Sequence, residues 1–208
     1  MRLEFRAMQT AWIALAAYLL GSVSFAIVVS RLMRLPDPRD YGSRNPGATN
    51  VLRSGSRAAA AFTLAGDAGK GWLAVWLTLR FFGDPSSIGV DASVAGLCVF
   101  LGHLFPAYHR LRGGKGVATA AGVLVGLDPW LGVATLASFG VVAAIFRMVS
   151  LASMVAALFA AFYTFWLFGL QAVTGAVSIM ALLLVYRHRE NIGRIVRGEE
   201  RRLGGKTT

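Results

Sequence analysis

Residues 90–129 read VDASVAGLCVFLGHLFPAYHRLRGGKGVATAAGVLVGLDP. In this stretch a short basic connection has one apolar run before it and one after it. The run 90–105 carries one acidic residue, Asp91, and the run 117–127 carries no charge. The connection between them contains Arg110, Arg112 and Lys115. Apolar runs joined by a basic loop are typical of a chain that crosses a membrane more than once.

The composition of the whole chain agrees with that interpretation. Of its 208 residues, 56% are hydrophobic, above the roughly 45–50% of ordinary soluble domains, and the mean hydropathy is +0.59. Little sequence is left for a separate soluble domain, so we expect one all-α integral membrane domain over residues 1–208. The lone Cys98 excludes an internal disulfide and shows no metal-ligand spacing.

Seven apolar segments are separated by connections of two kinds. The segments are 11–32, 58–82, 90–105, 117–127, 130–146, 151–168 and 172–186. Basic residues occupy the connections 33–57 and 106–116, the turn at Arg147 and the tail 187–208, whereas 83–89, 128–129 and 169–171 carry none. Cytoplasmic loops retain Lys and Arg during insertion. The alternation therefore predicts about seven transmembrane segments, one or two of them short, with the N-terminus outside and the basic loops and C-terminal tail in the cytoplasm.

Two features leave the topology open. Arg2 and Arg6 stand at the end expected outside, where they could instead mark the start of a signal peptide. The apolar run that follows is long for a signal peptide and lacks a clear cleavage site. The segment 117–127 is also short for a bilayer about 30 Å thick, so five or six complete spans with a re-entrant piece remain an alternative. An even number of spans would place both termini on one side.

The formal net charge of +11 would suggest nucleic acid as a partner of a soluble protein. Here the basic residues follow the loop pattern, and the tail has no interleaved aromatic residues, so we expect no nucleic acid as partner. The arginines of the tail are instead expected to meet anionic membrane lipid. They are Arg194, Arg197, Arg201 and Arg202.

Inside the apolar segments, two patterns point to packing. Small residues such as Ala95-Gly96 and Ala120-Ala121-Gly122 suit close approach of helices. Asp67 and Lys70 share one helical face, where each offsets the cost of burying the other. This pair is interpreted either as structural neutralisation or as an intramembrane functional site.

The first polar cluster, residues 40–50, lies in a basic connection and is followed by Arg53. Ser43, Thr49 and Asn50 offer hydroxyl and amide groups, and a guanidinium binds phosphate bidentately. Since these donors all suit phosphate, we expect a phosphate site here.

The second cluster, Gly113-Gly114-Lys115-Gly116, resembles a nucleotide-binding loop but has glycine where such a loop needs a magnesium-binding hydroxyl. Consecutive glycine N–H groups leading into a helix at Val117 could still bind an anion, with Lys115 adding charge. The alternative is a flexible basic loop on lipid headgroups.

Two further clusters lie at cytoplasmic helix ends. Ser150-Leu151-Ala152-Ser153 enters the sixth segment, and His188 with Asn191 shares a helical face just after the seventh. A histidine beside three anion-compatible clusters is a candidate for orienting or deprotonating a hydroxyl. The chain has no HxxxxD, GxSxG or HExxH pattern and no close carboxylate cluster, so neither a metal nor another cofactor is expected.

Together these motifs resemble the bacterial membrane acyl-phosphate:glycerol-3-phosphate acyltransferases, the PlsY family. The resemblance covers nearly the whole chain, with the motifs in the family's order. They are Gly42-Ser43 with Asn45, Gly47-Ala48-Thr49-Asn50, Gly102-His103 with Phe105-Pro106, Gly113 to Thr119, Ser150 to Ser153, and His188 with Asn191. Arg44, Arg112 and Arg202 depart from residues common in the family: a small glycine at the first, and lysine at the other two.

The resemblance implies a seven-helix fold in the bacterial cytoplasmic (inner) membrane, with its active site at the cytoplasmic face. It implies acyl transfer from acyl phosphate to the 1-hydroxyl of glycerol 3-phosphate, which gives lysophosphatidic acid and inorganic phosphate. Ser43, Thr49, Gly114 and Lys115 would hold the acyl-phosphate phosphoryl group, and Arg53, Lys115, Ser153, His188 and Asn191 would hold glycerol 3-phosphate. Lys115, His188 and Asn191 are expected to be catalytic.

Two questions stay open at this point. Either His188 or a substrate phosphate oxygen accepts the hydroxyl proton. A small transporter of anions or phosphate esters is the competing function, although the external connections are short and nearly featureless.

Overall fold

The computed structural model describes residues 2–82 and 89–204, and these residues form helices and no strand. In chain order the α-helices are α1 (Arg2–Gly21), α2 (Phe25–Leu32), α3 (Ala48–Val51), α4 (Arg57–Phe82), α5 (Val90–Leu104), α6 (Val117–Leu127), α7 (Pro129–Phe146), α8 (Val149–Phe168), α9 (Ala172–Arg187) and α10 (Arg189–Val196). Two 3-10 helices, η1 (Leu52–Ser54) and η2 (Ala107–His109), lie in the loops. The all-helical fold expected from the sequence is confirmed for the described residues.

The short segment 117–127 is reproduced by α6, and local chemistry explains where it stops. Asp128 caps α7 by accepting a hydrogen bond from the Leu131 N–H at 2.8 Å, and Pro129 occupies the first position of that helix. Proline suits the first turn because its missing N–H would have no partner in the helix there.

Among the described helices, three are long and apolar enough by themselves to cross a membrane. They are the stretches 90–109, 129–146 and 149–168. The bent pair of α1 and α2 makes a fourth if it is one broken span, and α6 and α9 are shorter apolar helices. Seven crossings therefore stay a prediction.

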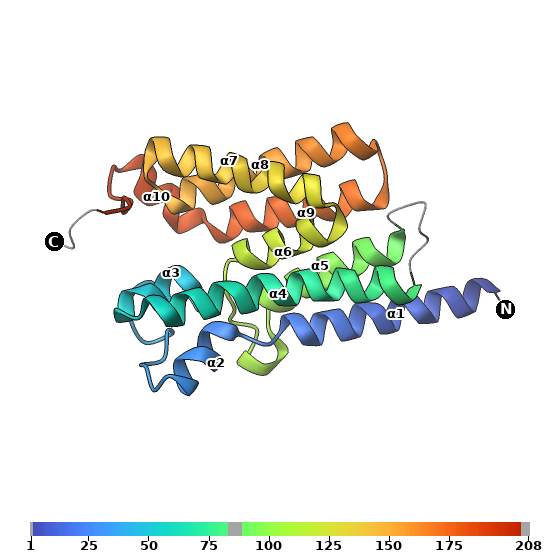
Figure 1. The fold of residues 1–208 in the computed structure, drawn as a ribbon, viewed down its shortest axis with the longest axis horizontal. Helices are drawn as coiled ribbons and strands as arrows, with labels where there is room; N and C mark the ends of the chain where they lie inside the picture. The colour runs from blue at the N-terminus through green and yellow to red at the C-terminus, as the bar shows by residue number, and fades with distance from the viewer. Residues whose placement is uncertain (1, 83–88, 205–208) are drawn as a thin grey trace.

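The helices run along one long axis in two groups (Figure 1). One group contains α7, α8, α9 and α10, the other contains α1, α2, α4 and α5, and α6 lies between them, in contact with α4, α5 and α7. The start of α1 and the helix α10 lie at opposite ends of the bundle (Figure 1). This separation of the described chain ends agrees with an odd number of crossings.

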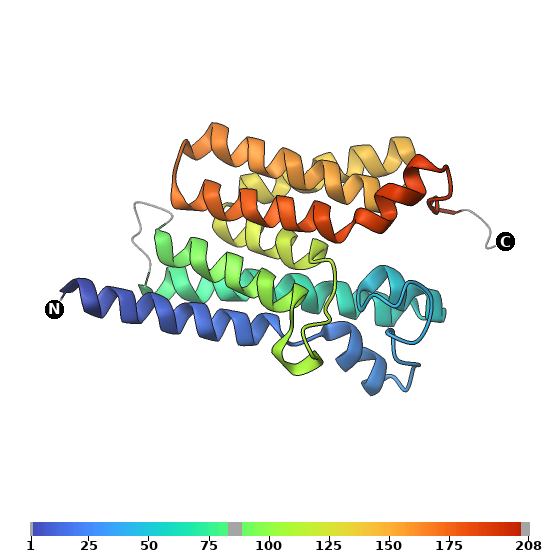
Figure 2. The ribbon, with the colours of Figure 1, turned by 180° about the vertical axis from the view of Figure 1, so that it is seen from behind.

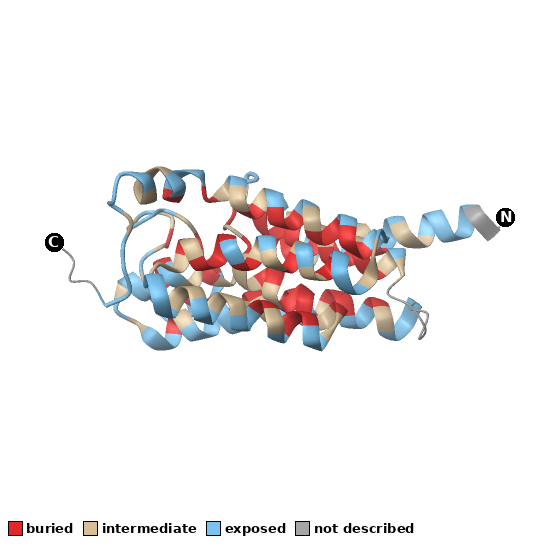
Figure 3. Ribbon diagram, turned by 90° about the horizontal axis from the view of Figure 1, so that it is seen from above, coloured by how far each residue is buried: buried red, intermediate tan, exposed pale blue. Residues whose placement is uncertain are grey.

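Close helix crossings depend on glycine. A Cβ atom at Gly122 of α6 would overlap the carbonyl oxygen of Ala68 on α4, and one at Gly71 of α4 would overlap that of Thr119 on α6. Because lipid gives helices no hydrophobic drive to associate, such close contact is a main source of their cohesion. Figure 3 shows that buried residues concentrate in the middle of the bundle, where these helices cross.

The first apolar run, 11–32, was expected as one transmembrane segment, and the structure divides it between two helices. It breaks between Gly21 and Phe25, and the two parts are bent by 40°. The ammonium of Lys70 donates hydrogen bonds to the carbonyl oxygens of Gly21 at 2.9 Å and Val23 at 2.7 Å. Lys70 on α4 therefore stabilises two backbone carbonyls at the break, one at the last residue of α1 and one in the connection to α2.

Asp67 and His103 complete this buried cluster. The Asp67 carboxylate lies 2.9 Å from the Lys70 ammonium and 3.4 Å from Nδ1 of His103, and all three side chains are at most 6% exposed. The cluster joins the break after α1 to the end of α5. The contacts thus favour the structural interpretation of the Asp67–Lys70 pair.

Candidate active site

The polar connections of the chain meet at one end of the bundle. The connections after α2, α5 and α7 and the tail after α9 all lie toward the end that carries α2, α3 and α10 (Figures 1 and 2). Gly114 marks one contact between them, because a Cβ there would lie 2.9 Å from the carbonyl oxygen of Pro46 in the first loop. The fold therefore brings the sequence clusters toward a common region.

Asn50 organises the first loop. Its amide nitrogen donates to the carbonyls of Pro38 at 2.6 Å and Tyr41 at 3.1 Å. Its amide oxygen accepts from the backbone N–H of Ser43 at 3.0 Å and from Arg53 at 3.3 Å. Since Asn50 is 2% exposed and both its polar atoms bind the loop, it shapes the loop rather than presenting a free donor to a substrate.

The glycine loop differs from the expected anion cradle. The Gly113 N–H donates to the Leu104 carbonyl at 3.2 Å, and the Gly114 N–H donates to the His103 carbonyl at 3.1 Å. These acceptors belong to the last turn of α5, where helical carbonyls lack partners. The expectation that both glycine amides point at an anion is therefore wrong: they fasten the loop to α5, and Lys115 is the group that the loop presents.

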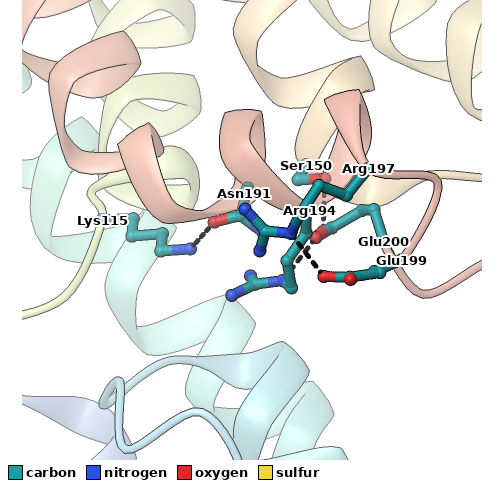
Figure 4. Close-up of polar contacts among 7 residues, drawn as sticks. All are labelled: Lys115, Ser150, Asn191, Arg194, Arg197, Glu199 and Glu200. Atoms are coloured by element: carbon teal, nitrogen blue, oxygen red, sulfur yellow. Dashed lines mark hydrogen bonds and ion pairs between the residues drawn. The ribbon is translucent and has the colours of Figure 1, made fainter.

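A polar network extends from Lys115 to the tail (Figure 4). The Lys115 ammonium donates to the side-chain oxygen of Asn191, whose amide nitrogen donates to Glu200 at 2.6 Å. Glu200 also accepts from the hydroxyl of Ser150 at 2.6 Å and from Arg194 at 2.8 Å. Donors from α8 and α10 thus converge on one carboxylate of the tail, and Lys115 joins the network through Asn191.

The charges of this region influence one another. Burial lowers the pKa of Lys115 to about 8, and the nearby positive charge of Arg194 adds to the effect. Burial alone would raise the pKa of Glu200, but hydrogen bonds from Ser150, Asn191 and Arg194 outweigh burial and lower it. At pH 7 the site therefore holds an ammonium and a carboxylate joined through one asparagine.

Arg53 belongs electrostatically to the same region. Desolvation lowers its pKa, and the positive charges of Arg201 and Arg194 lower it further. The crowding of cations from the first loop, from α10 and from the tail favours binding of an additional anion.

His188 is buried at the junction of α9 and α10. Its exposed fraction is 3%, and burial lowers its pKa to about 4, so the ring is neutral at pH 7. Because Nδ1 lies 2.8 Å from the Leu184 carbonyl, which can only accept, Nδ1 carries the proton. Nε2 then has a lone pair and can accept a proton or a hydrogen bond.

The remaining predicted site residues lie as follows. Ser43 is exposed in the first loop, and Thr49 is exposed in the short helix α3. Ser153 is buried in α8 and donates to the Val149 carbonyl of its own helix at 2.8 Å. The structure therefore joins Lys115 and Asn191 directly but does not bring the Ser153 hydroxyl into their network.

Sequence reasoning missed two participants: Ser150 and Glu200. Ser150 begins the quoted Ser-Leu-Ala-Ser motif, so that motif held the signal for it. Glu200 stood among arginines assigned to lipid contact, and only the return of the tail onto α8 shows its role. Among the described residues, no group of three or more His, Cys, Asp or Glu side chains is placed to bind a metal ion.

Comparison with known proteins places the chain in context. The family model described as "Glycerol-3-phosphate acyltransferase" matches residues 11–198. The chain is 56% identical over 193 residues to the glycerol-3-phosphate acyltransferase of Cupriavidus necator, with 93% of this chain and 96% of that one covered. It is also 56% identical over 201 residues to the enzyme of that name from Burkholderia pseudomallei strain K96243, covering 96% and 98%.

Two solved structures share the fold. Both are crystal structures of PlsY, an integral membrane glycerol 3-phosphate acyltransferase, one in its glycerol 3-phosphate form and one in its lysophosphatidic acid form. The TM-scores are 0.88 and 0.85 at 34% and 33% sequence identity, with 94% of this chain and 96% of the PlsY chain covered. The similarity thus extends over the bundle and the site at its end.

Proposed function

Because this chain belongs to the glycerol-3-phosphate acyltransferase family, we propose that it transfers a fatty acyl group from an acyl phosphate to the 1-hydroxyl of glycerol 3-phosphate. The products are lysophosphatidic acid and inorganic phosphate, the outcome of the first acylation step in phospholipid biosynthesis. The acyl phosphate donor is the part of this proposal that goes beyond family membership.

One observation carries the proposal: donors for an anion converge at the end of an apolar helix bundle. Lys115 comes from the loop before α6, and Asn191 and Arg194 come from α10, where both already bind the Glu200 carboxylate. Donors that bind a carboxylate in this way also suit phosphate oxygens. The apolar helices beside them suit an acyl chain that stays in membrane lipid.

We assign roles within this region as follows. Ser43, Thr49 and Lys115 hold the phosphoryl group of the acyl phosphate, and Gly114, whose N–H is bonded to the His103 carbonyl, contributes by fixing the loop that presents Lys115. Arg53, Lys115, Ser153, His188 and Asn191 hold glycerol 3-phosphate, with the Ser153 hydroxyl turning from the Val149 carbonyl to the substrate. Asn50 supports these contacts by shaping the loop that carries Ser43 and Arg53.

The reaction requires little covalent chemistry from the protein. The 1-hydroxyl oxygen attacks the acyl carbonyl carbon, the bond from that carbon to the phosphate oxygen breaks, and inorganic phosphate leaves with the bonding electron pair. The hydroxyl proton passes either to Nε2 of His188 or to a phosphate oxygen. Holding the reactants in attack geometry contributes up to about 7–11 kcal/mol in favourable intramolecular systems.

The membrane setting follows from the same proposal. The chain is a multi-pass protein of the bacterial cytoplasmic (inner) membrane, with residues 33–57, 106–116 and 187–208 in the cytoplasm. Glycerol 3-phosphate, a water-soluble ester, reaches the site from that side, and the acyl phosphate reaches it from lipid. Neither metal nor other cofactor is required.

Release of inorganic phosphate tests the proposal. Purified protein in detergent is given acyl phosphate and glycerol 3-phosphate, with and without EDTA, and phosphate and lysophosphatidic acid are measured. We expect equal amounts of both products, dependence on both substrates, and no effect of EDTA. Failure to form lysophosphatidic acid from acyl phosphate would exclude this donor, and the same assay with acyl thioesters would then identify the alternative.

Two variants test the assigned roles. Lys115→Ala removes a charge from the shared phosphate region and is expected to lower kcat/KM by about a hundredfold or more.

His188→Ala is expected to lower kcat by about a hundredfold if the histidine is the base. Full activity of His188→Ala would leave the substrate phosphate oxygen as the proton acceptor.

A further inference from the structure

Arg187 binds the backbone carbonyl groups of the glycine loop. Its Nη2 atom donates to the carbonyl of Gly113 at 2.7 Å, and its Nε atom donates to the carbonyl of Gly114 at 3.2 Å. The guanidinium carbon also lies 5.9 Å from the ring centre of Phe105, in cation–π contact. One side chain therefore contacts both glycines and the residue that follows α5.

The loop is consequently held by both kinds of backbone group. The N–H groups of Gly113 and Gly114 bond to the last carbonyls of α5, and their carbonyls bond to Arg187. A Cβ at Gly114 would overlap Nε2 of His103, so the packing there is also tight. Lys115 leaves this clamped dipeptide directly and reaches Asn191.

Arg187 is also the last residue of α9, immediately before His188, and Asn191 lies one turn further along α10. The guanidinium thus ties the loop that carries Lys115 to the helix end that carries the other two residues assigned to chemistry. Its planar fork matches two neighbouring carbonyls, whereas a lysine ammonium at the same place would act as a single point donor.

We propose that Arg187 is a positioning residue for the acyl transfer: it clamps the Gly113–Gly114 dipeptide so that Lys115 is held in register with His188 and Asn191. The kinetic consequence rests on the proposed function, but the clamp itself does not. Displacement of a positioned group by about 1 Å can cost on the order of a hundredfold in rate.

The chain offers a matched control in Arg189. Its guanidinium lies 4.9 Å from the Tyr186 ring centre and so, like that of Arg187, contacts an aromatic ring. Arg189 is exposed, and the arginine that binds the carbonyls of Gly113 and Gly114 is Arg187. Arg187→Gln and Arg189→Gln therefore change the charge equally but differ in the clamp.

Limited trypsin digestion in detergent measures the clamp without any substrate. Cleavage after Arg112 and Lys115, followed by mass spectrometry, reports opening of the loop. We expect Arg187→Gln to accelerate these two cleavages at least about tenfold, since hydrogen bonds to a charged group are lost, while cleavage elsewhere and the thermal unfolding midpoint stay unchanged. Arg189→Gln should match the wild type.

Kinetics measure the consequence. We expect Arg187→Gln to lower kcat/KM for glycerol 3-phosphate by between about tenfold and a hundredfold, with Arg187→Lys intermediate and Arg189→Gln unchanged. Arg187→Gln that behaves like Arg189→Gln in digestion and kinetics would overturn the inference. General destabilisation, with faster cleavage throughout the chain, would equally overturn it, because Arg187 would then support the fold rather than the loop.

The two proposals fail in different ways. Wild-type protein that forms no lysophosphatidic acid would contradict the proposed function, and the digestion pattern would then decide the clamp by itself. Active wild type with an unchanged loop in Arg187→Gln would contradict only the clamp.

Discussion

At the scale of single residues, the protonation of Lys115 sets a pH limit on binding. Burial lowers the pKa of this ammonium to about 8 from an ordinary value of 10.5. The positive charge is therefore present below pH 8 and is lost as the pH rises through that value. A lysine on the surface, with the ordinary pKa of 10.5, would keep its charge to a pH more than two units higher.

We accordingly expect kcat/KM for glycerol 3-phosphate to fall above pH 8 in the wild type, because this parameter reports groups of the free enzyme. Lys115→Arg provides the control. A guanidinium stays charged throughout the accessible range, so this variant is expected to be less active at pH 7 but to lose the fall above pH 8. An unchanged alkaline fall in Lys115→Arg would assign it to another group.

The same scale shows what the sequence could predict about the site. Lys115, His188 and Asn191 were identified from their residue types and motifs, and the structure places Lys115 against Asn191. The role of Glu200 was not predictable, because its partners Ser150 and Asn191 lie 50 and 9 residues away. Residue type reveals which groups suit an anion, but long-range contacts decide which of them already have partners.

At the scale of secondary-structure elements, the crossing of α4 and α6 limits which residues the interface tolerates. Gly122→Ala would push a methyl group into the backbone carbonyl of Ala68, which cannot move aside as a side chain could. Overpacking of this kind costs about 1–3 kcal/mol. We expect the thermal unfolding midpoint in detergent to fall by about 2–4 °C for each kcal/mol lost.

Gly140→Ala is the matched control for that measurement. Gly140 lies inside α7 and has no neighbouring atom within 4 Å of the position that a Cβ would occupy. Alanine favours a helix over glycine by up to about 1 kcal/mol, so this change should leave the midpoint unchanged or raise it. Equal midpoints for the two variants would contradict a tight α4–α6 crossing.

Helix positions followed from the sequence more readily than helix breaks. Runs of apolar residues located α5 to α9, and Asp128-Pro129 marked the start of α7, because these signals are local. The break after Gly21 escaped prediction because the ammonium that binds its carbonyls belongs to Lys70, 49 residues away. Gly21 ends α1, but residues 22–24 contain no proline that would have marked the break more clearly.

At the scale of the whole molecule, the basic connections that alternate along the sequence gather at one end of the bundle, together with α10 (Figure 1). Membrane insertion favours Lys and Arg in cytoplasmic loops, and a phosphate-binding site also needs Lys and Arg. Both requirements are met when the basic connections lie at one end of the bundle. Under the proposed function and topology, one set of arginines would serve both membrane orientation and substrate binding.

The helix α9 is short for a crossing, and labelling of single cysteines tests whether it crosses. Its 16 residues rise about 24 Å, less than a bilayer core of about 30 Å. In a Cys98→Ala background, Gln171→Cys and Glu199→Cys place thiols at exposed positions on either side of α9. We expect a membrane-impermeant maleimide to label Gln171→Cys in intact spheroplasts and Glu199→Cys only after permeabilisation, because the proposed topology places the tail in the cytoplasm. The reverse pattern would contradict this orientation. Labelling of both thiols from one side would mean that α9 does not cross, and would favour an even number of spans.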